Sequence, residues 1–196
     1  MNIVKSIPEE LVVWSFLAAE LNSSRFAEGS KKALKMLNLP KSIVTKPKLG
    51  DPIQNQQRAY LLHLTRGWPN QWLFEKFPNN VKWCMVDLTI DELKASYRLK
   101  SSAGMSLIER NVGNTSSMIS GSQAVENIDS KLVLQIQKKI EAGENILPII
   151  LVAKDKASRR VLVEGHSRSI AYALSNQQKI KAILGLSSKI SSWEYY

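Results

Sequence analysis

Five consecutive residues near the carboxyl end, Glu164-Gly165-His166-Ser167-Arg168, combine side chains that bind or transform anionic groups. They follow an apolar segment that predicts a strand and precede a segment whose apolar spacing predicts a helix. Gly165 is therefore expected to make a tight turn with a positive φ. The free N–H groups at the start of a helix, together with the positive end of its dipole, bind phosphate well. The sequence thus predicts an anion site at this turn.

Each side chain of the turn has an expected role. Arg168 supplies a bidentate cation, Ser167 a hydroxyl that caps the helix or donates to the ligand, and His166 a donor that becomes charged near neutral pH. Glu164 is a candidate general base or Mg²⁺ ligand, and His166 is the second catalytic candidate. A purely structural alternative is that Glu164 pairs with Arg168 while Ser167 only caps the helix.

The first half of the chain predicts helices. We expect them over residues 6–21, 30–37 and 53–66, with Ser6 as the N-cap of the first and Gly67 at the C-terminal end of the third. The Pro-rich stretch 39–52 predicts a loop. The aromatic segment 68–78 predicts a packed connector whose tryptophans belong to the core.

After Pro78 short strands alternate with helices. We expect strands over 81–88, 147–153, 160–164 and 179–185, the second and third forming a hairpin, and helices over 90–96, 130–142 and 167–174. The polar stretch 100–122 predicts a long loop, with at most a short helix near 105–109. This order predicts an α+β fold, a small mixed sheet with flanking helices over residues 79–196, preceded by a helical N-terminal extension over residues 1–78.

The run Val-Leu-Val-Glu-Gly-His-Ser-Arg-Ser-Ile-Ala-Tyr-Ala-Leu, residues 161–174, together with Ile149-Ile-Leu-Val, resembles the core of the ParB/sulfiredoxin superfamily. Members of that superfamily place a Gly-x-x-Arg turn after a β-hairpin and follow it with a helix. The expected helix over 130–142, leading into Asn145-Ile-Leu-Pro-Ile, is similar to the segment that ParB-type domains carry before the hairpin. The resemblance covers roughly the last half of the chain, from Val81, and points to a bacterial branch with a helical N-terminal region.

This resemblance implies that Gly165 and Arg168 hold the phosphates of a nucleotide, as in ParB with CTP, sulfiredoxin with ATP, and the free-serine kinases. It implies ATP, ADP or CTP with Mg²⁺ as ligands, and phosphoryl transfer or nucleotide hydrolysis as the class of reaction. His166 departs from the pattern, because sulfiredoxin and the serine kinases carry their His two residues after the Gly. Sulfiredoxin also needs a Cys directly after the Gly, so its chemistry is not expected here.

The charge balance gives a second hypothesis. The chain has 27 Lys+Arg against 17 Asp+Glu, a net charge of +10, which favours an anionic partner. Residues 25–48 hold seven basic side chains against Glu28 alone. A DNA-binding protein or nuclease would use the same turn, with Arg25, Lys31, Lys32 and Lys35 as its electrostatic footprint. The plain alternative is a solvated helix face, and a third possibility for the whole chain is a regulatory or interaction module without catalysis.

Other classes of protein are not expected. Cys84 is the single cysteine and there are two His, so neither an internal disulfide nor a zinc cluster is predicted. Cys84 is expected to be buried, and His63 to be structural. The longest apolar run, 146–153, is too short for a membrane span, and the first residues lack the pattern of a secretory signal. We therefore expect a cytoplasmic protein without a membrane partner.

Overall fold

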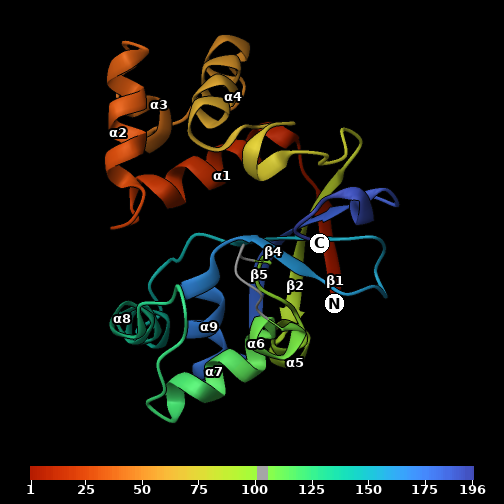
Figure 1. Ribbon diagram of the computed structural model, residues 1–196. Coiled ribbons are helices and arrows are strands. Elements are labelled where there is room, and N and C mark those ends of the chain that lie inside the picture. The colour runs from red at the N-terminus through yellow and green to blue at the C-terminus, as the bar shows by residue number, and fades with distance from the viewer. Residues whose placement is uncertain (101–105) are drawn as a thin grey trace.

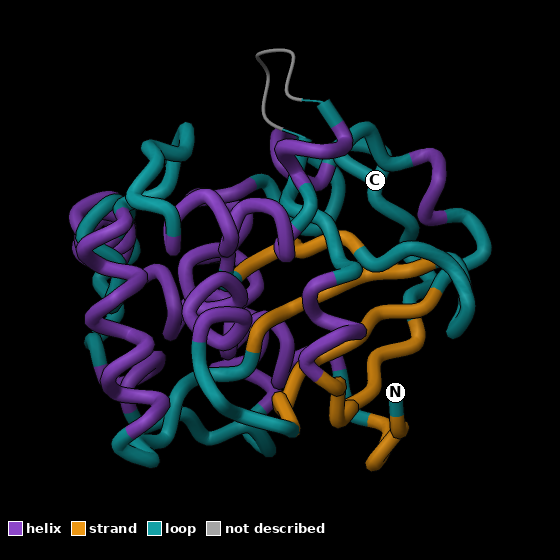
Figure 2. Tube along the Cα trace, turned by 90° about the horizontal axis from the view of Figure 1, so that it is seen from below, coloured by secondary structure: helices purple, strands orange, loops and turns teal. Residues whose placement is uncertain are grey.

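The computed structural model describes residues 1–100 and 106–196 and has the α+β fold that the sequence predicts. One mixed sheet contains five strands in the order β1-β2-β5-β3-β4. Strands β3 and β5 are parallel, and the other neighbours are antiparallel. The strand bounds are β1 Asn2–Ser6, β2 Lys82–Thr89, β3 Ile149–Ala153, β4 Val161–Glu164 and β5 Lys179–Leu186. Figure 2 shows these strands side by side, with the N-terminus beside the sheet.

Helices cover both faces of the sheet. In Figure 1, α1 to α4 lie above the sheet, and α5 to α9 lie below it. The helix bounds are α1 Glu9–Leu21, α2 Ala27–Met36, α3 Ser42–Thr45, α4 Pro52–Arg66, α5 Ile90–Lys94, α6 Leu107–Arg110, α7 Val112–Ser120, α8 Ser130–Glu141 and α9 His166–Leu174. Two short 3₁₀ helices, Trp72–Phe74 and Ile190–Ser192, complete the described elements.

The strands at the centre of the sheet bury both of their faces. Val152, Val163 and Ile183 pack with the side chains of α1 and α4 in one apolar cluster. Leu151 and Leu184 point to the opposite face and pack in a second cluster with side chains of α5, α7 and α9. This alternation along each strand follows from the period of two in β-structure. The helical N-terminal region and the sheet therefore share one core.

Several expected features are confirmed. The hairpin forms from β3 and β4, and β3 is buried along its whole length. Gly67 ends α4 with φ 80°, as expected. The helix expected from residue 90 begins there as α5, and Thr89 caps it through a reciprocal pair of bonds with Glu92. Cys84 is buried, and His63 Nδ1 lies 2.8 Å from the carbonyl oxygen of Trp68.

Three expectations for the first half are wrong. Residues 2–6 form the edge strand β1 and not part of a helical region, because they pair with β2. Ser6 consequently lies in this strand, and Pro8 takes the N-cap position of α1 without a side-chain cap. Trp72 is 61% exposed and lies outside the core that Trp68 and Trp83 join.

The expected loop over 100–122 is wrong in its second half. α6 overlaps the short helix that the sequence left open near 105–109, whereas α7 is unexpected and forms because Val112 and Ile119 pack into the cores around α9. Residues 101–105 of that expected loop lie outside the described residues. The expected loop over 39–52 also contains the single-turn helix α3.

The division at residue 78 stays a prediction. The structure shows that β1, from the N-terminal segment, belongs to the sheet of the C-terminal segment. None of the helices within residues 1–100 and 106–196 combines the length and the apolar character that crossing a membrane requires.

Candidate anion-binding site

The turn between β4 and α9 has the predicted backbone geometry. Gly165 adopts φ 97° and takes the N-cap position of α9. A Cβ atom at this position would lie 2.8 Å from Cγ2 of Ile149, so the turn passes close against β3. Both the positive φ and this close approach favour glycine.

The N-terminus of α9 is open. Its first helical bond runs from the N–H of Ser169 to the carbonyl of Gly165, at 2.8 Å. Among residues 1–100 and 106–196, no acceptor bonds the backbone N–H groups of His166, Ser167 or Arg168, and no side chain caps the helix. Ser167 therefore does not act as the cap. Three backbone donors and the positive end of the helix dipole are available for an anion.

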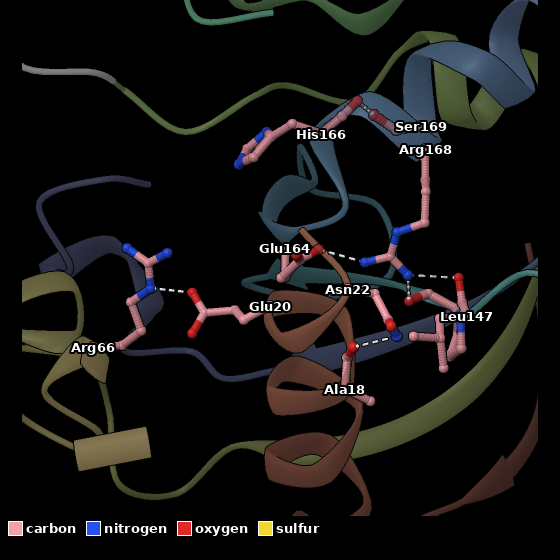
Figure 3. Close-up of polar contacts among 10 residues, drawn as sticks. Ala18, Glu20, Asn22, Arg66, Leu147, Glu164, His166, Arg168 and Ser169 are labelled. Atoms are coloured by element: carbon pink, nitrogen blue, oxygen red, sulfur yellow. Dashed lines mark hydrogen bonds and ion pairs between the residues drawn. The ribbon is translucent and has the colours of Figure 1, made fainter. Parts of the chain in front are cut away.

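Arg168 is bound by groups of the protein itself. Its Nη1 donates to the carbonyl oxygens of Leu147 and Pro148, at 2.7 and 2.9 Å, and its Nη2 donates to Glu164 Oε2 at 2.5 Å. Figure 3 shows the guanidinium turned toward Glu164 and Leu147, while the ring of His166 points in a different direction. The pairing of Arg168 with Glu164 is the one that the structural alternative foresees, and the bonds to Leu147 and Pro148 also hold the turn against the segment before β3.

His166 lies in a strongly positive environment. Burial, followed by the positive charges of Arg98, Arg168 and Arg25, lowers the pKa of His166 to about 3. The residue is partly exposed, but its Nδ1 atom is buried and has no hydrogen-bond partner among the described residues. At neutral pH the imidazole is therefore uncharged, and it donates from whichever nitrogen carries the proton.

Arg98 is a further cation near the turn, and the sequence predicted no role for it. It is 5% exposed, and its Nη2 donates to the backbone oxygen of Glu126 at 2.8 Å. Its Nε and Nη1, which carry three of the five guanidinium N–H groups, have no partner within the described part of the chain. A buried guanidinium with unpaired donors is costly, so these atoms need acceptors, and a bound anion is one partner that would also balance the charge.

Pairing of the backbone next to Arg98 with β4 brings Arg98 near the turn. Tyr97 forms a parallel bridge with Val161, and its carbonyl accepts the N–H of Leu162 at 2.8 Å. The chain after Tyr97 thus runs beside β4 in the direction that leads to Gly165. Consistent with this course, Arg98 has the largest effect of any charge on the pKa of His166.

A second charged group faces the turn from α1 and α4. Glu20 is 2% exposed and is paired with Arg66, whose guanidinium also lies 3.8 Å from the ring centroid of Phe26. Burial raises the pKa of Glu20 to about 7, although Arg66 opposes the shift, and the negative charge of Glu164 adds to it. In Figure 3 the side chain of Glu20, on α1, lies below Glu164 and points toward Arg66.

The basic residues proposed for nucleic acid divide into two groups. Arg25 precedes α2, is exposed, and has the smallest of the three charge effects that lower the pKa of His166. Lys31, Lys32 and Lys35 are exposed on α2. Of the four, Arg25 is the one whose charge acts measurably on the turn, through the pKa of His166.

The residues present do not form a ready metal site. Glu164, the predicted Mg²⁺ ligand, is committed to Arg168. Residues 1–100 and 106–196 contain no cluster of three or more His, Cys, Asp or Glu side chains arranged to hold a metal ion. Mg²⁺ at this turn stays a prediction.

Sequence reasoning missed Arg98, Glu20 and Arg66. Arg98 stands between Tyr97 and Leu99, and a cation between two apolar side chains is the one local signal of a buried arginine. Glu20 lies three residues after Leu17, on a helix whose apolar residues surround it on several sides, which signals a buried carboxylate.

Comparisons of the chain with protein-family models, with curated proteins and with solved structures found no match.

Proposed function

We propose that this protein binds a phosphate-bearing ligand, of the nucleotide class, at the open N-terminus of α9. The ligand set comprises Arg98, His166 and the backbone N–H groups of residues 166–168. The observation that carries the proposal is the buried guanidinium of Arg98, whose Nε and Nη1 lack partners among the described residues beside an uncapped helix start. Phosphate oxygens satisfy such donors and gain from the helix dipole.

The proposal gives Arg168 and Glu164 positioning roles. Their mutual bond and the bonds of Arg168 to two carbonyl oxygens hold the turn in the conformation that leaves the amides free. Binding is proposed in preference to proton transfer, because a His with a pKa of about 3 is poorly matched to acid–base work near pH 7. The catalytic roles of Glu164 and His166 stay predictions.

Calorimetric titration and thermal shift with phosphate, ATP, ADP and CTP, each with and without Mg²⁺, test the proposal. Arg98→Gln should weaken binding of every phosphate-bearing ligand by about tenfold or more, because it removes a charge-assisted bond. Lys156→Gln is the matched control, since it removes one exposed positive charge at the opposite end of β4 and should change affinity by less than about twofold.

Two results would overturn the proposal. One is the absence of binding by the unaltered protein to any of these ligands. The other is equal binding by Arg98→Gln and the unaltered protein. Arg98→Lys keeps the charge but loses the planar donor fork, and it serves as the second variant if Arg98→Gln does not fold.

A further inference from the structure

The helical N-terminal region carries six exposed lysines that we call the lysine surface. It comprises Lys31, Lys32 and Lys35 of α2, and Lys41, Lys46 and Lys48 of the segment that joins α2 to α4. The acidic residue of segment 25–48 is Glu28, which lies 3.7 Å from Lys32. The lysine surface therefore keeps a large positive excess.

The lysines of α2 form one exposed row. Positions 28, 31, 32 and 35 follow helical spacing on the solvent side, while Ser30, Ala33 and Leu34 are buried. With a rise of about 1.5 Å per residue, Lys31 and Lys35 are separated by about 6 Å along the axis. This is close to the rise of two nucleotides along a duplex strand, about 7 Å.

The backbone that bears the other lysines is fixed by side chains of α4. Arg58 is fully buried and donates from Nη1 to the carbonyl of Ile43, at 3.0 Å, and from Nη2 to the carbonyl of Lys48, at 3.2 Å. Asn55 Nδ2 donates to the carbonyl of Leu49 at 2.8 Å. Burying an arginine to hold a surface segment is costly, and the result is a segment whose ordering entropy is already lost before any partner binds.

We propose that the lysine surface binds the phosphodiester backbone of a nucleic acid without reading its bases. Ammonium groups in a row on a helix, with three more on the fixed segment that follows it in the chain, suit phosphates that repeat at a regular spacing. Anionic membranes are bound by flexible basic segments together with inserted apolar side chains, and an acidic protein has no such regular repeat of charge. DNA and RNA share the backbone chemistry, and the experiment separates them.

The lysine surface is independent of the anion site proposed above. None of its six residues belongs to the ligand set at the start of α9. Arg98→Gln should therefore leave nucleic-acid binding unchanged, so the two proposals succeed or fail separately.

Fluorescence anisotropy tests the proposal with a short labelled DNA duplex, an RNA duplex and the single strands, over about 50 to 200 mM salt. One variant replaces Lys31, Lys32 and Lys35 by Gln, and a second replaces Lys41, Lys46 and Lys48 by Gln. The matched control replaces three exposed lysines of α8, Lys131, Lys138 and Lys139, by Gln and removes the same charge.

Each surface variant should lower the affinity about tenfold or more. It should also reduce the slope of log affinity against log salt by about 2.7, or about 0.9 for each phosphate that a lysine no longer neutralises. The control should change affinity less than about twofold. All nine replaced side chains are exposed, so circular dichroism should show an unchanged fold.

Three results would overturn the proposal. The first is an equal loss of affinity in the α8 control, which would make the binding a property of net charge alone. The second is unchanged binding by either surface variant. The third is no binding to DNA or RNA at the lowest salt, including the case in which vesicles with anionic lipid are bound instead.

Discussion

Glu164 and Arg168 face each other across the turn between β4 and α9, with Oε2 and Nη2 2.5 Å apart. Both side chains are largely buried. Arg168 also donates hydrogen bonds to the carbonyl oxygens of Leu147 and Pro148. The pair links the end of β4, the start of α9 and the entry to β3. It fixes the shape of the turn and leaves Arg98 as the buried cation near the turn whose donors lack partners among the described residues.

The pair should therefore act on stability as a unit. Arg168→Gln leaves a buried carboxylate and two carbonyl groups without their partner and should lower the free energy of unfolding by about 2–4 kcal/mol. Urea unfolding of Arg168→Gln, Glu164→Gln and the double variant measures the coupling, which should exceed about 1 kcal/mol. Additive single effects would show that the two residues do not depend on each other.

Phosphate should raise the pKa of His166. Burial and three guanidinium groups hold that pKa at about 3, and a bound anion adds a negative charge that favours the imidazolium. NMR titration of the ring resonances, without and with saturating phosphate, measures the change. His63 is the other histidine of the chain and provides an internal reference. A pKa of His166 that is the same with and without phosphate would place the anion elsewhere.

Gly165→Ala should destabilise the protein by about 1–3 kcal/mol, because φ 97° disfavours a side chain and the new Cβ would meet Ile149 at 2.8 Å. Gly29→Ala is the matched control. Gly29 lies in α2 with open space around it, so this change should stabilise the helix by about 0.5–1 kcal/mol. Thermal unfolding of the two variants should shift in opposite directions, and a shift in the same direction contradicts the strain at Gly165.

Glu20 should make stability fall as the pH rises from about 4.5 to 7. Its pKa is about 7 in the folded protein and 4.5 in the unfolded chain. Between these two pH values the folded state therefore binds a proton that the unfolded state has released. The loss should amount to no more than about 3 kcal/mol. Glu20→Gln removes this dependence, so its stability relative to the unaltered protein should be higher at pH 8 than at pH 5. Urea unfolding of both proteins at pH 5 and pH 8 measures this difference in stability. A difference that is the same at the two pH values would contradict the raised pKa of Glu20.

The sequence could predict the turn because its parts are local. A strand, a glycine and a helix lie within a few residues, and their order fixes both the positive φ of Gly165 and the open start of α9. Arg98 could not be found this way, since it reaches the turn only through the bridge between Tyr97 and Val161. That contact is tertiary, and no local pattern encodes it.

Two of the missed elements, β1 and α7, have physical reasons of the same kind. β1 is a largely exposed edge strand that lacks a clear alternating pattern, and its pairing with β2 alone defines it. α7 is rich in residues that favour turns, namely Gly, Asn, Ser and Thr. It is helical because Val112 and Ile119 are anchored in apolar clusters.

The position of β1 decides how α1 to α4 are joined to the sheet. The chain leaves the sheet after β1 and returns to it at β2, and the N–H of Ile7 donates to the carbonyl of Trp83 at 3.0 Å, where the outgoing and returning segments meet. Residues 7–81 are thus a long excursion whose two ends are immediate neighbours. The excursion is therefore attached to the sheet covalently at one corner only, and the rest of its attachment is the apolar cluster that its helices share with β3, β4 and β5.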